Sequence, residues 1–165
     1  MENNKGIGGH QSPKIGSDTW LTPMYIINEL GPFDLDPCTP QNMPWDTARK
    51  RYTKEQDGLK QPWDGYVWLN PPYGKQTGEW IKKLSDHGNG IALIFARTET
   101  NMFFEYVWHK ADALLFLKGR ISFHKEDGSM ASSNAGAPSV LVAYGYDAEL
   151  ALYQCKLPGK FIRLK

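Results

Sequence analysis

Short apolar runs recur along the chain, and they predict the strands of a sheet. The run at 91–95 is continuously apolar, which is typical of a central strand that is buried on both faces. Shorter runs rich in β-branched and aromatic residues predict further strands at 33–36, 66–69, 113–117, 121–123 and 140–144, with an edge strand at 161–164.

Amphipathic segments lie between these runs and predict helices over 23–30, 77–87 and about 100–109. Thr22 suits the N-cap of the first helix and Pro23 its first position. Apolar residues at helical spacing are expected to face the core, namely Tyr25, Ile26 and Leu30, then Trp80, Ile81 and Leu84, then Phe103, Phe104 and Val107.

Strands that alternate with helices indicate an α/β fold, with a mostly parallel sheet covered on both faces in a Rossmann-like order. The late strands are close enough in sequence to permit an antiparallel pair. A βαβ unit needs about 30 residues, so the polar, proline-rich stretch at 37–65 is too short for two further units, and we expect a truncated sheet. We expect one domain over 18–165, preceded by a flexible segment at 1–17.

The composition narrows the function classes. The chain has 165 residues, a formal net charge of +1 and no apolar run long enough to span a bilayer, and its N-terminus lacks the apolar core of a signal peptide. We therefore expect a cytoplasmic protein without membrane contact. Cys38 and Cys155 form no ligand-spaced cluster, so no metal site or disulfide framework is expected. A charge this small leaves nucleic-acid binding to local basic patches, of which 49–51 with Lys54 is the densest.

The tetrapeptide Asn70-Pro71-Pro72-Tyr73 carries the strongest chemical signal and follows the predicted strand at 66–69. Two prolines stop a strand abruptly, and ligands bind at the carboxyl ends of strands in an open α/β sheet. The Asn70 side-chain oxygen and the Pro71 carbonyl suit the two hydrogens of an amino group, and Tyr73 suits stacking on a flat base. A turn that merely closes the strand is the alternative.

Several further motifs follow one another in order after residue 17. They are Asp18-Thr19-Trp20-Leu21-Thr22-Pro23, Phe33-Asp34-Leu35-Asp36-Pro37-Cys38, Asp57-Gly58-Leu59, Val67-Trp68-Leu69-Asn70-Pro71-Pro72-Tyr73-Gly74, Ala96-Arg97-Thr98 and Leu117-Lys118-Gly119-Arg120-Ile121-Ser122-Phe123. With them the chain resembles the phage- and prophage-type DNA N6-adenine methyltransferases, a short Dam-like family. The resemblance implies S-adenosylmethionine (SAM) as cofactor, adenine N6 in duplex DNA as methyl acceptor, and flipping of that base out of the duplex.

The resemblance also implies roles for individual residues. The catalytic residues would be Asn70, Pro71, Pro72 and Tyr73. The residues that hold SAM would be Trp20, Thr22, Pro23, Asp36, Pro37, Asp57 and Asn70. The DNA contacts would be Tyr73, Arg97, Lys118, Arg120 and Phe123. Plainer alternatives are a helix start with Trp20 as its staple, turn roles for Asp36 and Asp57, an Arg97–Glu99 ion pair, and surface charges beside a core Phe123.

The chain departs from a typical methyltransferase in three ways. No glycine follows the first strand until Gly58, no acidic residue stands where a second strand would bind the cofactor ribose, and no segment is long enough for a separate target-recognition domain. Sequence recognition is therefore expected from loops at 40–51 and 128–138. The same chemistry on RNA or on a protein glutamine, or a domain that only binds cofactor or nucleic acid, stays open as an alternative.

Overall fold

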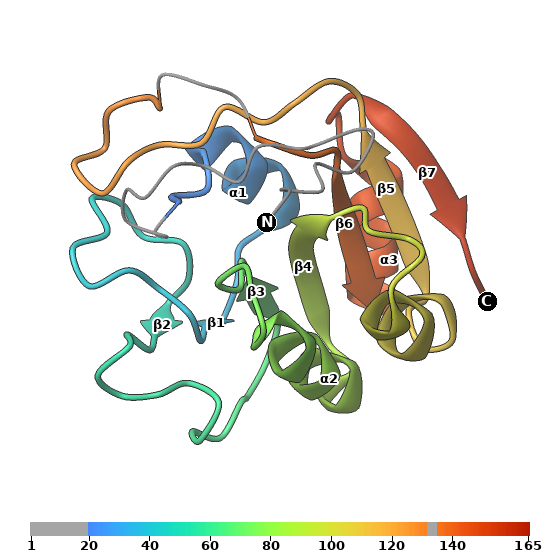
Figure 1. The fold of residues 1–165 in the computed structure, drawn as a ribbon, viewed down its shortest axis with the longest axis horizontal. Coiled ribbons are helices and arrows are strands. Elements are labelled where there is room, and N and C mark those ends of the chain that lie inside the picture. The colour runs from blue at the N-terminus through green and yellow to red at the C-terminus, as the bar shows by residue number, and fades with distance from the viewer. Residues whose placement is uncertain (1–19, 132–134) are drawn as a thin grey trace, which may run out of the picture.

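A seven-stranded sheet forms the centre of the computed structural model, which describes residues 20–131 and 135–165 (Figure 1). Its strands are β1 (Leu35–Asp36), β2 (Lys50–Arg51), β3 (Val67–Leu69), β4 (Gly90–Phe95), β5 (Ala113–Leu117), β6 (Ser139–Tyr144) and β7 (Gly159–Arg163). Their order across the sheet is β2-β1-β3-β4-β6-β5-β7. The segment at 1–17 that we expected to be flexible lies outside the described residues.

The strand directions confirm an α/β fold with a Rossmann-like sheet. β2, β1, β3 and β4 are parallel neighbours, and β6 then runs antiparallel between β4 and β5. β7 adds a second antiparallel strand at the edge beyond β5. The parallel half is short, since β1 and β2 have two residues each and β3 has three. The stretch at 37–65, expected to be too short for two further βα units, holds β2 and no helix.

Helices cover both faces of the sheet (Figure 1). α1 (Met24–Leu30) and α3 (Tyr146–Gln154) pack on one face, and α2 (Thr77–His87) and the π-helix η1 (Phe103–Trp108) pack on the other. On β3, Trp68 joins the core beneath α1 and α3, whereas Val67 and Leu69 join the core beneath α2. None of the helices in the described ranges is long and apolar enough to cross a membrane.

The helix predicted at 77–87 is confirmed with the same bounds, and its three expected core residues are buried. Gly88 ends it in the left-handed region, with φ of 74°, and donates its N–H to the Leu84 carbonyl at 2.9 Å. The first helix begins later than predicted, at Met24. Pro23 is its N-cap, because a ψ of 140° is extended rather than helical, so Thr22 lies outside the helix.

Two aromatic residues predicted to face the core are exposed instead. Tyr25 on α1 is 54% exposed, and Phe104 on η1 is 49% exposed. The segment predicted as an ordinary helix at 100–109 contains the π-helix, whose wider turns bury Phe103 and Val107 but rotate Phe104 toward solvent.

The segment predicted as a strand at 121–123 does not join the sheet. The Ile121 carbonyl accepts the N–H of Ala135 at 2.8 Å, and the Phe123 carbonyl accepts the N–H of Ala131 at 2.9 Å. The backbone is therefore paired with the loop that follows it, and His124 forms an isolated antiparallel bridge with Leu21. This pairing places His124 beside Leu21, shortly before α1.

Candidate active site

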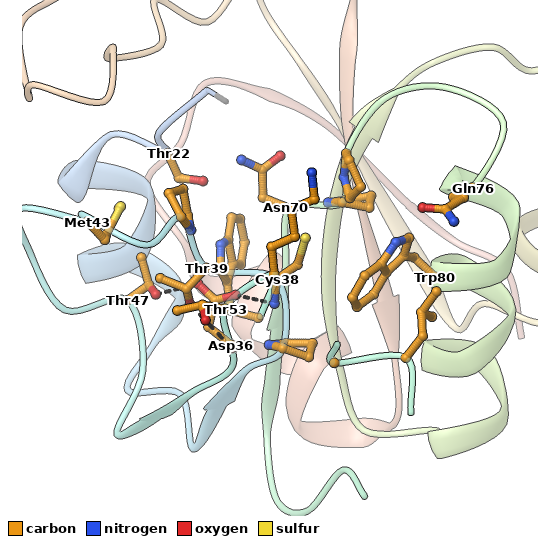
Figure 2. Close-up of a pocket in the computed structure, with 18 of the residues that line it drawn as sticks. Thr22, Asp36, Cys38, Thr39, Met43, Thr47, Thr53, Asn70, Gln76 and Trp80 are labelled. Carbon is orange, nitrogen blue, oxygen red and sulfur yellow. Dashed lines mark hydrogen bonds between the residues drawn. The ribbon is translucent and has the colours of Figure 1, made fainter. Parts of the chain in front are cut away.

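A cleft opens at the carboxyl ends of β1 and β3 (Figure 2). Asp36 ends β1 and Asn70 follows β3, so both reach the cleft from neighbouring parallel strands. The cleft has a volume of about 770 Å³, within the range of about 300–1,000 Å³ that is usual for small-molecule and cofactor sites. Its walls come mainly from residues at 20–22, 36–43, 53–60 and 70–80, together with Thr47 and Trp68.

The structure brings most of the predicted site residues together. Those that line the cleft are Trp20, Thr22, Asp36, Pro37, Asp57, Asn70, Pro71, Pro72 and Tyr73. Those outside its lining are Pro23, Arg97, Lys118, Arg120 and Phe123. The residues expected to hold the cofactor therefore gather in one place, with Pro23 as the exception, whereas those expected to bind DNA do not, apart from Tyr73.

The Asn70 side chain is held by one hydrogen bond and keeps its oxygen unpaired. Its Nδ2 donates to the Trp20 carbonyl at 3.0 Å, and this bond settles the orientation of the amide, because a carbonyl can only accept. Its Oδ1 is buried, and none of the described residues donates a hydrogen bond to it. Buried polar atoms are nearly always hydrogen-bonded, so this oxygen is an acceptor suited to a donor on a ligand.

Thr77, the first residue of α2, fixes the turn that follows Asn70. Its hydroxyl donates to the Pro72 carbonyl at 2.8 Å, and the Gly74 N–H donates to the same hydroxyl oxygen at 3.0 Å. The two prolines have fixed φ values, and Pro71 is itself buried. The main chain of this turn is thus held in place before any ligand arrives.

Tyr73 is stacked on Phe95, the last residue of β4. The ring centroids are 4.2 Å apart and the rings are within 13° of parallel. The Tyr73 hydroxyl is buried without a partner among the described residues, and this burial raises the pKa of Tyr73 above its usual value. The residue therefore offers the cleft a neutral aromatic ring, backed by a second ring, rather than a base.

Asp36 is buried, at 4% exposure, with both carboxylate oxygens engaged. The Cys38 N–H donates to Oδ1 at 3.0 Å, and the Thr47 hydroxyl donates to Oδ2 (Figure 2). Burial raises the pKa of Asp36, although these hydrogen bonds oppose the rise. Burial and the neighbouring Asp36 charge raise the pKa of Cys38 to about 12, so Cys38 is a thiol at neutral pH and not a nucleophile.

Gly58 lets its loop pack directly on the backbone at Pro37. A Cβ at this position would lie 1.9 Å from the Pro37 carbonyl oxygen, so only glycine fits. Lys83 on α2 holds the same loop by donating to the Leu59 carbonyl at 2.6 Å. Asp57 has a φ of 52°, a left-handed conformation that costs free energy in any residue but glycine and that concentrates at functional sites.

The loops expected to read a DNA sequence meet beside the cleft. The Trp45 indole donates to the Thr22 carbonyl at 3.2 Å, and its ring lies edge-on to His124 with centroids 5.2 Å apart. A Cβ at Gly128 would lie 3.3 Å from Pro44. Parts of the loops at 40–51 and 128–138 therefore lie against each other, and Trp45 joins them to Thr22, which lines the cleft.

The charged residues predicted to contact DNA are exposed and lie away from the cleft lining. Arg97 follows β4, and the ion pairs among the described residues do not include it, so the alternative pairing with Glu99 is not formed. Lys118 and Arg120 follow β5. All three cations remain accessible to a ligand that extends beyond the cleft.

Phe123 is a core residue rather than a surface contact. It is 4% exposed, and its ring centroid lies 6.4 Å from that of Trp20. In this position Phe123 cannot stack on a base, and the alternative that it is a core residue is correct. It acts behind the site by packing against Trp20, whose carbonyl orients Asn70.

Three residues join the site without a sequence motif to announce them. Thr47 bonds Asp36 from a loop, and Phe95 supports Tyr73 from the end of the central strand. Trp80 was predicted as a core residue and is buried, but it also lines the cleft. The position of Phe95 at a strand end was the one available signal. No cluster of residues able to hold a metal ion occurs within 20–131 and 135–165.

Comparison with known proteins agrees with this geometry. The family model for DNA N-6-adenine-methyltransferase (Dam) matches residues 9–150. The chain belongs to this family. Within Dam, a relative named DNA N-6-adenine-methyltransferase, from Escherichia phage T1, is 29% identical over 121 residues, and the match covers 63% of this chain and 50% of the relative. The chain thus spans about half the length of that relative. No solved structure matches the chain.

Proposed function

We propose that this Dam-family chain transfers a methyl group from SAM to the N6 amino group of adenine in DNA. The observation that carries the proposal is the buried Oδ1 of Asn70, an acceptor without a partner among the described residues, on a residue that lines a cofactor-sized cleft. Family membership and the name of the phage T1 relative support the same activity. For a phage-encoded enzyme, the place of action would be the host cytoplasm.

The cleft fits SAM in its size and in its donors and acceptors. Asp36 and Asp57 place carboxyl groups in two of its walls, and Asp57 is paired with Lys60 through Oδ2 at 3.0 Å. Because an ionised carboxylate has about four acceptor sites, these groups can still take an ammonium group, hydroxyls or the exocyclic amine of a purine. The backbone at Gly58 packs closely on Pro37, so the loop that carries Asp57 is held against the residue that follows Asp36. When bound, SAM supplies an electrophilic methyl group on a sulfonium, a good leaving group.

The polar groups at the end of β3 would activate the acceptor nitrogen. Adenine N6 is a weak nucleophile because its lone pair is delocalised into the ring. Asn70 Oδ1 and the Pro71 carbonyl would accept its two hydrogens and favour the tetrahedral nitrogen, whose lone pair forms the new N–C bond as the S–C bond breaks. The extra proton then passes to water. Because both acceptors are already fixed, they need no reorganisation during transfer.

An aromatic platform suits a base that has left the duplex. A flipped base loses its stacking, and an aromatic side chain restores part of that free energy. Tyr73 lines the cleft, and its ring is held rigid by Phe95. The wall that Trp45 and His124 form beside Thr22 would then contact the DNA around the flipped base.

A transfer assay with three acceptors tests the proposal. SAM labelled in its methyl group is incubated with the protein and with unmethylated duplex DNA, with RNA, or with a glutamine-containing peptide. Label recovered from DNA as N6-methyladenine supports the proposed function. Label in RNA or peptide alone would assign the same chemistry to that acceptor. Binding of SAM with no transfer to any of the three would assign a binding domain.

A further inference from the structure

We propose that the indole N–H of Trp80 binds the purine of the cofactor by donating a hydrogen bond to one of its ring nitrogens. The inference rests on the proposed function and adds a residue that none of the sequence motifs contains. Figure 2 shows the Trp80 side chain extending from α2 toward the cleft, whose lining it joins.

The first support is a buried donor without an acceptor. Trp80 is 6% exposed, its Nε1 is buried, and no acceptor for it occurs among the described residues. An indole N–H can only donate, and when buried it usually finds a partner. The missing partner must therefore be an acceptor, and a ligand in the cleft that Trp80 lines could supply it.

The other tryptophans show that an indole without an acceptor is unusual in the described part of the chain. Trp45, Trp63 and Trp108 each donate their indole N–H to a backbone carbonyl, at 3.2, 2.8 and 3.2 Å. The two buried indoles that lack an acceptor in the described part of the chain, Trp68 and Trp80, both line the cleft. Trp68 belongs to the core on the α1 side of the sheet, whereas Trp80 belongs to the core on the α2 side.

The neighbours of Trp80 connect it to the loop that carries Asp57. Its ring stacks near Trp63, with centroids 6.2 Å apart and planes within 24°. Trp63 in turn donates its N–H to the Gly58 carbonyl at 2.8 Å. This side of the cleft thus offers a carboxylate acceptor and an N–H donor. An aminopurine presents the complementary groups, which are an exocyclic amine and ring nitrogens that accept.

The donor is also held in place in advance. The Lys83 ammonium lies 5.1 Å from the centroid of the Trp63 ring, and its donation to the Leu59 carbonyl anchors the adjoining loop. Trp80 therefore packs against Trp63, which is held by its bond to Gly58 and by the Lys83 ammonium over its ring. A donor fixed in this way loses little freedom on binding, so its hydrogen bond contributes to affinity.

Calorimetry with S-adenosylhomocysteine, the product form of the cofactor, tests the proposal without relying on turnover. Trp80→Phe keeps an aromatic ring and removes the donor, so we expect its Kd to rise about three- to tenfold, the range for one hydrogen bond. Trp108→Phe is the matched control, because its N–H bonds a protein carbonyl outside the cleft. Its Kd should equal that of the wild type.

Analogues of S-adenosylhomocysteine that carry carbon in place of N1, N3 or N7 separate the donor from simple packing. The effect of Trp80→Phe should vanish with one analogue and persist with the other two. An unchanged Kd for Trp80→Phe, or an equal effect on all three analogues, would overturn the assignment. If the wild-type protein bound no S-adenosylhomocysteine, both the proposed function and the Trp80 contact would be wrong. If the wild-type protein bound it but Trp80→Phe left the Kd unchanged, only the Trp80 contact would be wrong.

Discussion

Asn70 donates from Nδ2 to the backbone carbonyl of Trp20, 50 residues away in sequence, at 3.0 Å. This contact links the N-terminal segment to the end of β3 and decides which amide atom remains free. The free atom is the buried Oδ1. An acceptor oriented in this way needs no rearrangement to take a hydrogen from an amino group, so it is the atom on which the proposed catalysis depends.

Replacing Asn70 should separate turnover from cofactor binding. Asn70→Ala removes the acceptor, so we expect methyl transfer to fall by about 10²–10³-fold, the loss typical of one preorganised catalytic hydrogen bond. Asn70→Asp keeps acceptor oxygens and should retain more turnover than Asn70→Ala. Binding of S-adenosylhomocysteine, followed by calorimetry, should persist in both variants. Unchanged turnover in Asn70→Ala would contradict the assigned role.

Tyr73 should act through its ring and not through its hydroxyl. The hydroxyl is buried without a partner in the described part of the chain, so Tyr73→Phe should cost no free energy of unfolding and should retain turnover. Phe95→Leu removes the stacked ring behind Tyr73 and should lower turnover several-fold while leaving S-adenosylhomocysteine affinity intact. Loss of turnover in Tyr73→Phe would instead point to a chemical role for the hydroxyl.

Asp36 should make stability depend on pH. Because burial raises its pKa in the native state, the native protein binds this proton more tightly than the unfolded chain does. The free energy of unfolding therefore falls as pH rises from about 4, the usual carboxyl value, toward the raised native pKa.

Asp36→Asn removes this titration, so the variant should gain stability relative to the wild type over that pH range. It should also bind S-adenosylhomocysteine more weakly, because the charge that suits the cofactor is lost. Urea unfolding at a series of pH values and calorimetry at neutral pH measure the two effects. A variant that is both less stable at neutral pH and equally tight in binding would remove Asp36 from the site.

Gly58 should tolerate no side chain. Gly58→Ala would place a Cβ against the Pro37 carbonyl, and the displacement should cost about 1–3 kcal/mol and weaken cofactor binding. Gly78→Ala in α2 is the control, since its Cβ would meet Met102 at an ordinary 3.6 Å. It should preserve stability or raise it slightly, because alanine favours helix. Equal melting temperatures and affinities for the two variants would show that the loop is free to shift.

The elements that could be predicted are those with strong local patterns. α2 was found with its bounds because Trp80 and Leu84 repeat at helical spacing and Gly88 ends the helix. α3 was missed because little but Ala148 and Leu152 is buried, while its two tyrosines are exposed, which leaves a weak periodicity. β2 was missed because it has two residues and is defined by pairing with β1 alone.

The site could be predicted as far as it depends on strand ends. Asp36 and Asn70 converge because the carboxyl ends of parallel neighbours meet at one edge of a sheet. The bond from Thr47 and the unpaired N–H of Trp80 follow from contacts between distant segments, and no local pattern encodes them. Phe123 was misjudged for the same reason, since its burial depends on its packing beside Trp20.

The most direct test of the central claim is nucleoside analysis of duplex DNA after incubation with SAM and either the wild-type protein or Asn70→Ala. We predict that the initial rate of N6-methyladenine formation falls by about 10²–10³-fold in the variant, although the variant still binds S-adenosylhomocysteine. Equal N6-methyladenine from both proteins, or none from the wild type while it binds SAM, would contradict the account.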